Sequence, residues 1–202
     1  MDSTTSPEPP SRASPQAALP PGPAGAAPAA SGRADFAFMR RHPAHWLALG
    51  FGAGLAPRAP GTVGTLWAWV AFLAIDPWVD AAGWAVLIGL ALLAGQWAAT
   101  RTAQHLGVAD PGAIVWDEVV AFWIVLWLLM PAPWWAQLAA FALFRYFDAA
   151  KPGPVRWADR LFKRLPGAPI GWRQGAGILL DDLVAAACTL LFIALWVRLW
   201  NS

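Results

Sequence analysis

Residues 117–130 read DEVVAFWIVLWLLM, an acidic pair followed at once by an unbroken apolar run. The run shows no alternation of apolar and polar residues, which argues against a half-buried β-strand. Carboxylates in the first turn of a helix are stabilised by its free N–H groups and its dipole. The stretch therefore predicts an apolar α-helix that carries two carboxylates at its start.

Four further apolar runs flank this one, and they also lack period-two alternation. They cover residues 62–78, 84–99, 134–147 and 183–200. A helix needs about 20 residues to cross the hydrocarbon core of a bilayer, and the central run and the run 134–147 are shorter than that. We predict an all-α fold, a compact helical membrane bundle of about five apolar helices, in which these two form a hairpin or dip in and return.

The composition also favours a membrane protein. The 202 residues are 58% hydrophobic and only 13% charged, whereas a soluble domain carries about 25% charged residues. The small net charge of +2 and the long apolar runs argue against a nucleic-acid partner. The single cysteine, Cys188, excludes an internal disulfide or a cysteine-based zinc cluster.

The first 34 residues differ from the rest in composition. They are rich in Pro, Ala, Ser and Gly and contain Pro-Pro pairs, so they bury too little apolar surface to offset the entropy of ordering. They begin with Asp2 and Glu8, and no apolar segment follows, which is unlike a secretory signal. We predict a disordered Pro/Ala-rich tail over 1–34 and a helical domain over 35–202.

Basic residues divide between the loops in a consistent way. Outside the tail, all but Arg198 lie before the first apolar run, between the second and third, or between the fourth and fifth. If every run crosses the membrane, these three stretches share one side. The positive-inside rule makes that side the cytoplasm.

Seven of the twelve acidic residues fall in the stretches assigned to the cytoplasmic side. Asp117–Glu118 and Asp181–Asp182 each precede an apolar run, so helix capping would explain either pair. Capping explains Asp148 poorly, because it follows an apolar run and the C-terminal end of a helix disfavours an anion. Hard cations such as Mg²⁺ take carboxylate ligands, so a divalent-cation site and a set of caps both remain open.

Candidate phosphate-binding groups lie near these acids. Three basic residues flank Asp148 in the sequence: Arg145, Lys151 and Arg156. Arginine binds phosphate as a bidentate fork and lysine binds it as a point charge. Arg58 lies in a Gly/Pro-rich segment, and Thr62 is the predicted N-cap of the next helix, whose free N–H groups would suit an anion. The segment lacks the Lys-Ser/Thr ending of a nucleotide P-loop and follows no strand.

The sequence gives little support for catalysis by histidine or by a serine nucleophile. His42, His45 and His105 are isolated along the chain, and no serine lies in a Gly-x-Ser-x-Gly setting. The sequence therefore favours chemistry carried by carboxylates and cations.

Four motifs in register resemble the phosphatidylglycerophosphatase A family over roughly residues 40–200. They are GFGAGLAPRAPGTVGTL (50–66), DPGAIVWDEVVAFW (110–123), FRYFDAAKPGPVRWADR (144–160) and GAGILLDDLVAA (175–186). Two departures from the family pattern are Ala121, where glycine is usual, and a longer stretch before the final acidic pair. Both affect helix packing or a loop and remove no charged residue.

The resemblance implies a bacterial, Mg²⁺-dependent enzyme that removes the terminal phosphate of phosphatidylglycerophosphate to give phosphatidylglycerol. It would act in the inner membrane with its site facing the cytoplasm. The implied catalytic and metal-binding residues are Asp117, Glu118, Asp148, Asp181 and Asp182. Lys151 and Asp159 match the motif around Asp148, and Arg58, Thr62, Arg145 and Lys151 are the candidate phosphate ligands.

Three alternatives remain open. A small ion-binding membrane transporter would also carry acids in apolar helices, although these acids gather on one side. A non-catalytic scaffold would use them only as caps. A phosphatase for another lipid phosphate, such as phosphatidic acid, would share the site and differ in substrate.

Overall fold

The computed structural model describes residues 34–161 and 169–200, and every regular element in these ranges is a helix. The predicted all-α class is therefore confirmed. The predicted disordered tail falls, apart from Ala34, outside the described residues.

All five apolar runs lie in helices. These helices are α3 (Pro60–Ile75), α4 (Ala81–Leu106), α5 (Trp116–Leu129), α6 (Trp134–Ala150) and α8 (Trp172–Trp200). Among the described residues, α4 and α8 are long and apolar enough to cross a membrane, and only 28% and 33% of their apolar windows are buried. Five crossings therefore stay a prediction.

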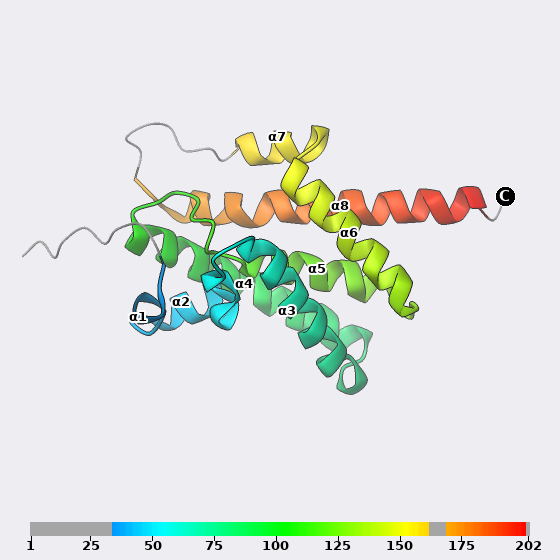
Figure 1. The fold of residues 1–202 in the computed structure, drawn as a ribbon, viewed down its shortest axis with the longest axis horizontal. Coiled ribbons are helices and arrows are strands. Elements are labelled where there is room, and N and C mark those ends of the chain that lie inside the picture. Colours follow the sequence, from blue (N-terminus) through cyan, green and yellow to red (C-terminus); the bar gives the residue numbers. More distant parts are fainter. Residues whose placement is uncertain (1–33, 162–168, 201–202) are drawn as a thin grey trace, which may run out of the picture.

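Short elements connect the long helices. They are α1 (Phe36–Met39), α2 (Pro43–Ala48), the 3₁₀ turns η1 (Gly50–Leu55) and η2 (Asp76–Trp78), and α7 (Gly153–Leu161). Figure 1 shows α7 beside α8 and at an angle to α6, on the opposite side of the bundle from α1 and α2.

Helix α5 forms the centre of the bundle and packs against α3, α4, α6 and α8. Its side chains from Val119 to Phe122 are fully buried. Two indole groups tie it to its neighbours, since Trp116 Nε1 donates to Ala91 O of α4 (3.0 Å) and Trp123 Nε1 donates to Ala68 O of α3 (2.9 Å). These bonds satisfy the indole N–H groups inside an apolar core.

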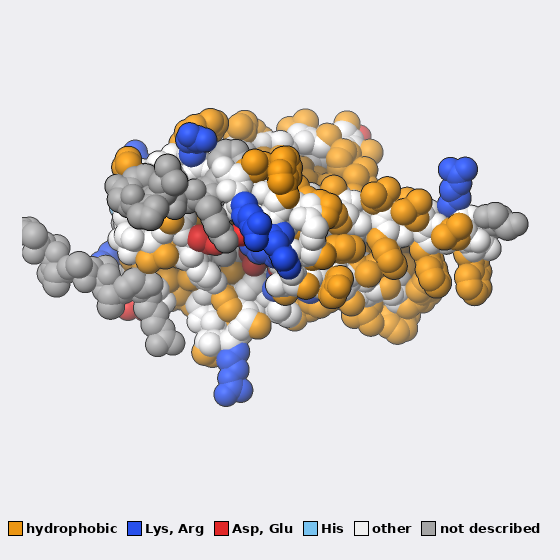
Figure 2. All heavy atoms as spheres, turned by 90° about the horizontal axis from the view of Figure 1, so that it is seen from above, with side chains coloured by type: hydrophobic (Ala, Val, Ile, Leu, Met, Phe, Trp, Pro, Cys, Tyr) orange, Lys and Arg blue, Asp and Glu red, His pale blue; other side chains and the backbone are white. Residues whose placement is uncertain are grey.

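The outer surface of the bundle is strongly apolar (Figure 2). Large side chains on several helices are exposed, including Val70, Leu93, Trp135, Leu191 and Leu199. Contiguous exposed apolar surface on this scale marks contact with lipid or with another protein. The pattern suits a bundle whose solvent is the bilayer.

Two expectations about helix starts are wrong. Helix α3 begins at Pro60 after Ala59, whose left-handed backbone (φ +48°) turns the chain, so Thr62 lies in the first turn and is not the N-cap. Helix α8 begins at Trp172, so Asp181 and Asp182 lie within it and do not open it. Each helix therefore begins upstream of its apolar run, and capping cannot explain the second acidic pair.

Candidate active site

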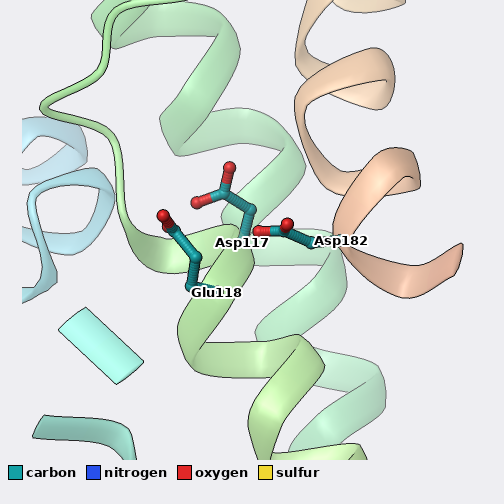
Figure 3. A group of neighbouring side chains, drawn as sticks. All are labelled: Asp117, Glu118 and Asp182. Atoms are coloured by element: carbon teal, nitrogen blue, oxygen red, sulfur yellow. The ribbon is translucent and has the colours of Figure 1, made fainter. Parts of the chain in front are cut away.

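Three carboxylates from two helices converge inside the bundle (Figure 3). Asp117 and Glu118 come from the first turn of α5, and Asp182 comes from α8. One oxygen from each lies within 4.8 Å of the other two. Asp182 is only 3% exposed. These three residues, the acidic trio, form a compact set of hard oxygen donors.

Two carboxylate oxygens of the acidic trio make no hydrogen bond within the described part of the chain. Asp117 Oδ1 and Glu118 Oε2 are buried and have no hydrogen-bond partner there. The N-cap residue of α5, Val115, makes no capping bond. Orphaned carboxylate oxygens in such a place are costly unless a cation or a proton joins them.

Burial, then the nearby charges of Glu118 and Asp182, raise the pKa of Asp117 well above its usual range. Burial likewise raises the pKa of Glu118, although the hydrogen bond from Asp117 opposes the change. A divalent cation would favour the ionised forms. The donor type, the burial and the orphaned oxygens all fit Mg²⁺.

Arg145 links the acidic trio to Asp148. Both lie in the last two turns of α6, where Arg145 forms an ion pair with Asp148. Arg145 Nη1 also lies 3.7 Å from Glu118 Oε1. The pair with Arg145 explains how Asp148 tolerates the C-terminal end of a helix. Arg145 Nε is buried without a described partner, so the guanidinium retains a free donor.

The start of α3 approaches this group closely. A Cβ atom added to Gly61 would collide with Glu118 Oε1 and would lie 3.1 Å from Arg145 Nη1. Ala59 makes no side-chain cap, so N–H groups of the first turn remain available to an acceptor. A helix N-terminus of this kind, beside Arg145, suits a phosphate oxygen.

Lys151 belongs to a second cluster. It ends α6 in a left-handed conformation (φ +44°), and its Nζ bonds Asp159 of α7 (2.8 Å) and Asp181 of α8. Burial alone would lower the pKa of Lys151, but the two carboxylates outweigh burial and raise it. The predicted residues thus divide into the acidic trio with Arg145 and Asp148, and a separate Lys151–Asp159–Asp181 cluster.

The remaining predicted residues lie at the edge of the site. Thr62 is half-buried in the first turn of α3, next to Gly61, and Arg58 is exposed in the loop before α3. Gly61 itself was missed by the sequence reasoning. Its role depends on the approach of α3 to α5, which a motif alone does not reveal.

The three histidines are also closer than their sequence positions indicated. His45 of α2 is buried, and its Nε2 lies 2.8 Å from Nδ1 of His105 on α4. Its Nδ1 lies 2.8 Å from Phe38 O. His42 packs against both rings. Sequence positions sixty residues apart gave no signal of this pairing.

Comparisons with known proteins agree on one family. The family model described as Phosphatidylglycerophosphatase A matches residues 46–197. A protein of that name from Escherichia coli (strain K12) is 38% identical over 149 residues, which cover 71% of this chain and 77% of the relative. A protein of the same name from Haemophilus influenzae is 38% identical over 72% of this chain and 83% of its own length.

A third relative carries a different name. A Bacteroides thetaiotaomicron protein, named provisionally as a phosphatidylinositol-3-phosphatase, is 37% identical over 73% of this chain and 91% of its own length. No solved structure matches the chain.

Proposed function

Since this chain belongs to the phosphatidylglycerophosphatase A family and is a phosphatase, we propose that it hydrolyses the terminal phosphate monoester of phosphatidylglycerophosphate. The products are phosphatidylglycerol and inorganic phosphate. The observation that carries this proposal is the buried convergence of the acidic trio beside Arg145 and the start of α3.

In this proposal, Asp117, Glu118 and Asp182 would hold Mg²⁺, while Asp148 positions Arg145 and Asp181 pairs with Lys151 beside the trio. A bound Mg²⁺ would polarise a phosphoryl oxygen and lower the pKa of a water molecule. The orphaned oxygens of Asp117 and Glu118 support the assignment.

The protein groups then bind and orient the monoester. The free Arg145 donor and the first-turn N–H groups of α3 bind phosphoryl oxygens, with Thr62 and Arg58 at the entrance. One carboxylate of the trio would take a proton from the attacking water as the water oxygen bonds to phosphorus. The ester P–O bond breaks, and that proton passes from the carboxyl to the leaving glycerol oxygen. Lys151 contributes by holding Asp181.

The acyl chains would stay in lipid beside the apolar helices. Helices α4 and α8 are the candidate spans, and the distribution of basic residues favours a cytoplasmic site. We place the enzyme in the bacterial inner membrane with the acidic trio toward the cytoplasm.

The test is phosphate release by detergent-purified protein from phosphatidylglycerophosphate, with Mg²⁺ and with EDTA. We expect release that requires Mg²⁺. Asp182→Asn should lower turnover at least a hundredfold, because it removes one donor of the trio. Mg²⁺ should raise the unfolding temperature of the parent protein and not that of the variant. Asp80→Asn is the matched control. Asp80 is the N-cap of α4 and lies outside the acidic trio, and asparagine can also serve as an N-cap.

Phosphatidic acid and phosphatidylinositol 3-phosphate run alongside, because a phosphatase for another lipid phosphate is the second candidate. The name of the Bacteroides relative favours including the latter. Preference for either lipid would reassign the substrate. No release from any of the three by folded protein with Mg²⁺ would overturn the phosphatase proposal.

A further inference from the structure

Helix α7 presents three distinct faces. Val155 and Ala158 are buried, and Asp159 points inward to Lys151. Trp157 is 63% exposed and Leu161 is 46% exposed. Arg156 and Arg160 are also exposed and lie four residues apart, hence on one side of the helix. We call this pair the basic stripe.

The basic stripe lies next to the proposed site and is not neutralised by a described ion pair. Asp159 connects α7 to Asp181 of α8 through Lys151, and Asp181 precedes Asp182 of the acidic trio. No ion pair of Arg156 or Arg160 occurs within residues 34–161 and 169–200. Figure 2, viewed from the side of α7, shows basic side chains gathered beside acidic ones.

The three faces of α7 follow one another in the same order as the chemical groups of the proposed lipid substrate. By the helical period, the basic stripe lies between the inward side of Asp159 and the outward apolar side of Trp157 and Leu161. An amphipathic helix of this kind suits a lipid interface. The substrate has the same order, with a terminal phosphate, then an inner phosphodiester, then acyl chains.

From this correspondence we propose that Arg156 and Arg160 bind the inner phosphodiester of the lipid while its terminal phosphate lies at the proposed active site, beside Arg145 and the start of α3. The inference rests on the proposed function and adds a specificity site to it. Arginine suits this task because its planar fork pairs with two phosphate oxygens. A lipid with a single phosphate cannot use both sites, so the basic stripe favours substrates with a second phosphate.

The test compares the double variant Arg156→Gln/Arg160→Gln with the parent protein in phosphatidylcholine vesicles. With phosphatidylglycerophosphate, kcat/KM should fall about tenfold or more, mainly through KM. Hydrolysis of phosphatidic acid should not change. Arg101→Gln, at an exposed arginine of α4, is the control. The double variant Arg156→Lys/Arg160→Lys should recover part of the loss.

Product inhibition gives a second readout that holds even if phosphatidic acid is a poor substrate. Inhibition by phosphatidylglycerol, which has only the inner phosphate, should weaken in the Gln variant, and inhibition by inorganic phosphate should not. Equal losses for both inhibitors would overturn the proposal in favour of a structural role.

Changing the lipid of the vesicles shows whether the basic stripe binds the inner phosphate of the substrate or the phosphate of a neighbouring lipid. A defect that appears only in vesicles with phosphatidylserine would show that the stripe binds surrounding anionic lipid, which would also overturn the proposal. Activity of the parent protein without any defect in the variant would refute this inference alone. Inactivity of the parent would refute the proposed function.

Discussion

Gly61 shows how a single missing side chain permits the geometry of the site. The first turn of α3 lies against Glu118 and Arg145 only because no Cβ atom stands between them. At the same scale, the adjacent residues Asp181 and Asp182 have different surroundings, one bonded to Lys151 and the other in the acidic trio. Individual contacts, more than composition, therefore define this site.

Gly61→Ala should lower the activity by more than any loss of folding stability would explain. The added methyl would displace the Glu118 carboxylate or move the start of α3, so we expect kcat to fall about tenfold or more. The measurement is phosphate release together with thermal unfolding.

Gly89→Ala is the matched control for that variant. A Cβ at Gly89, inside α4, would meet nothing within 4 Å, so the change should keep activity and stabilise the protein by about 0.5–1 kcal/mol. Full activity of Gly61→Ala would show that α3 does not need to approach Glu118 so closely.

At the scale of elements, the histidine pair fixes α1 and α2 to α4. His45 is enclosed by the ring of Phe38, stacked at a centroid distance of 3.9 Å, and by His105. Burial first, and then the charges of His105, His42 and Arg41, lower the pKa of His45, against the opposing effect of the Phe38 carbonyl. The neutral ring is therefore the form that suits this packing.

This packing predicts a pH-dependent stability. In the unfolded chain His45 would have its ordinary pKa of about 6.5, above the folded value. Between the two values the unfolded state binds more protons, so the free energy of unfolding falls as pH falls below about 6.5. Thermal unfolding from about pH 8 to about pH 5 should show a smaller slope for His45→Gln than for the parent. Equal slopes would refute the assignment to His45.

At the scale of the whole molecule, apolar side chains cover much of the outside of the helices, and the acidic and basic side chains of the site lie together, away from the Arg198 end of α8 (Figure 2). The turn around Trp78, which is 86% exposed, and the loop containing Gly112 precede and follow α4. If α4 crosses the bilayer, these two segments lie on opposite sides.

Cysteine labelling tests that arrangement. In a Cys188→Ser background, Trp78→Cys should react with an impermeant maleimide added to intact spheroplasts, whereas Gly112→Cys should react only after permeabilisation. This outcome follows from the positive-inside rule applied to the basic loops. Labelling of both sites from outside would contradict a crossing by α4. The Cys188→Ser protein without an added cysteine gives the background.

The sequence predicted the helical class, and three of the five acidic residues that it named, Asp117, Glu118 and Asp182, lie together in the structure. The apolar runs predicted every long helix, whereas the ion pair of Asp148 with Arg145 was found only in the structure. The pairing of Lys151 with Asp159 and Asp181, and of His45 with His105, could not be predicted, because each depends on how distant segments pack. The start of α3 was misplaced since the left-handed turn at Ala59 has no usual sequence signature.

The different surroundings of Asp181 and Asp182 require a fixed helical register in α8. Each added or removed residue turns the rest of a helix by about 100°. If the two aspartates keep their places, a single-residue insertion or deletion between Trp172 and Asp181 would therefore turn Gly175, Ile178 and Leu179 out of their buried positions. Homologues should therefore keep the number of residues between Trp172 and Asp181 constant, and length differences such as the longer stretch of this chain should fall before Trp172.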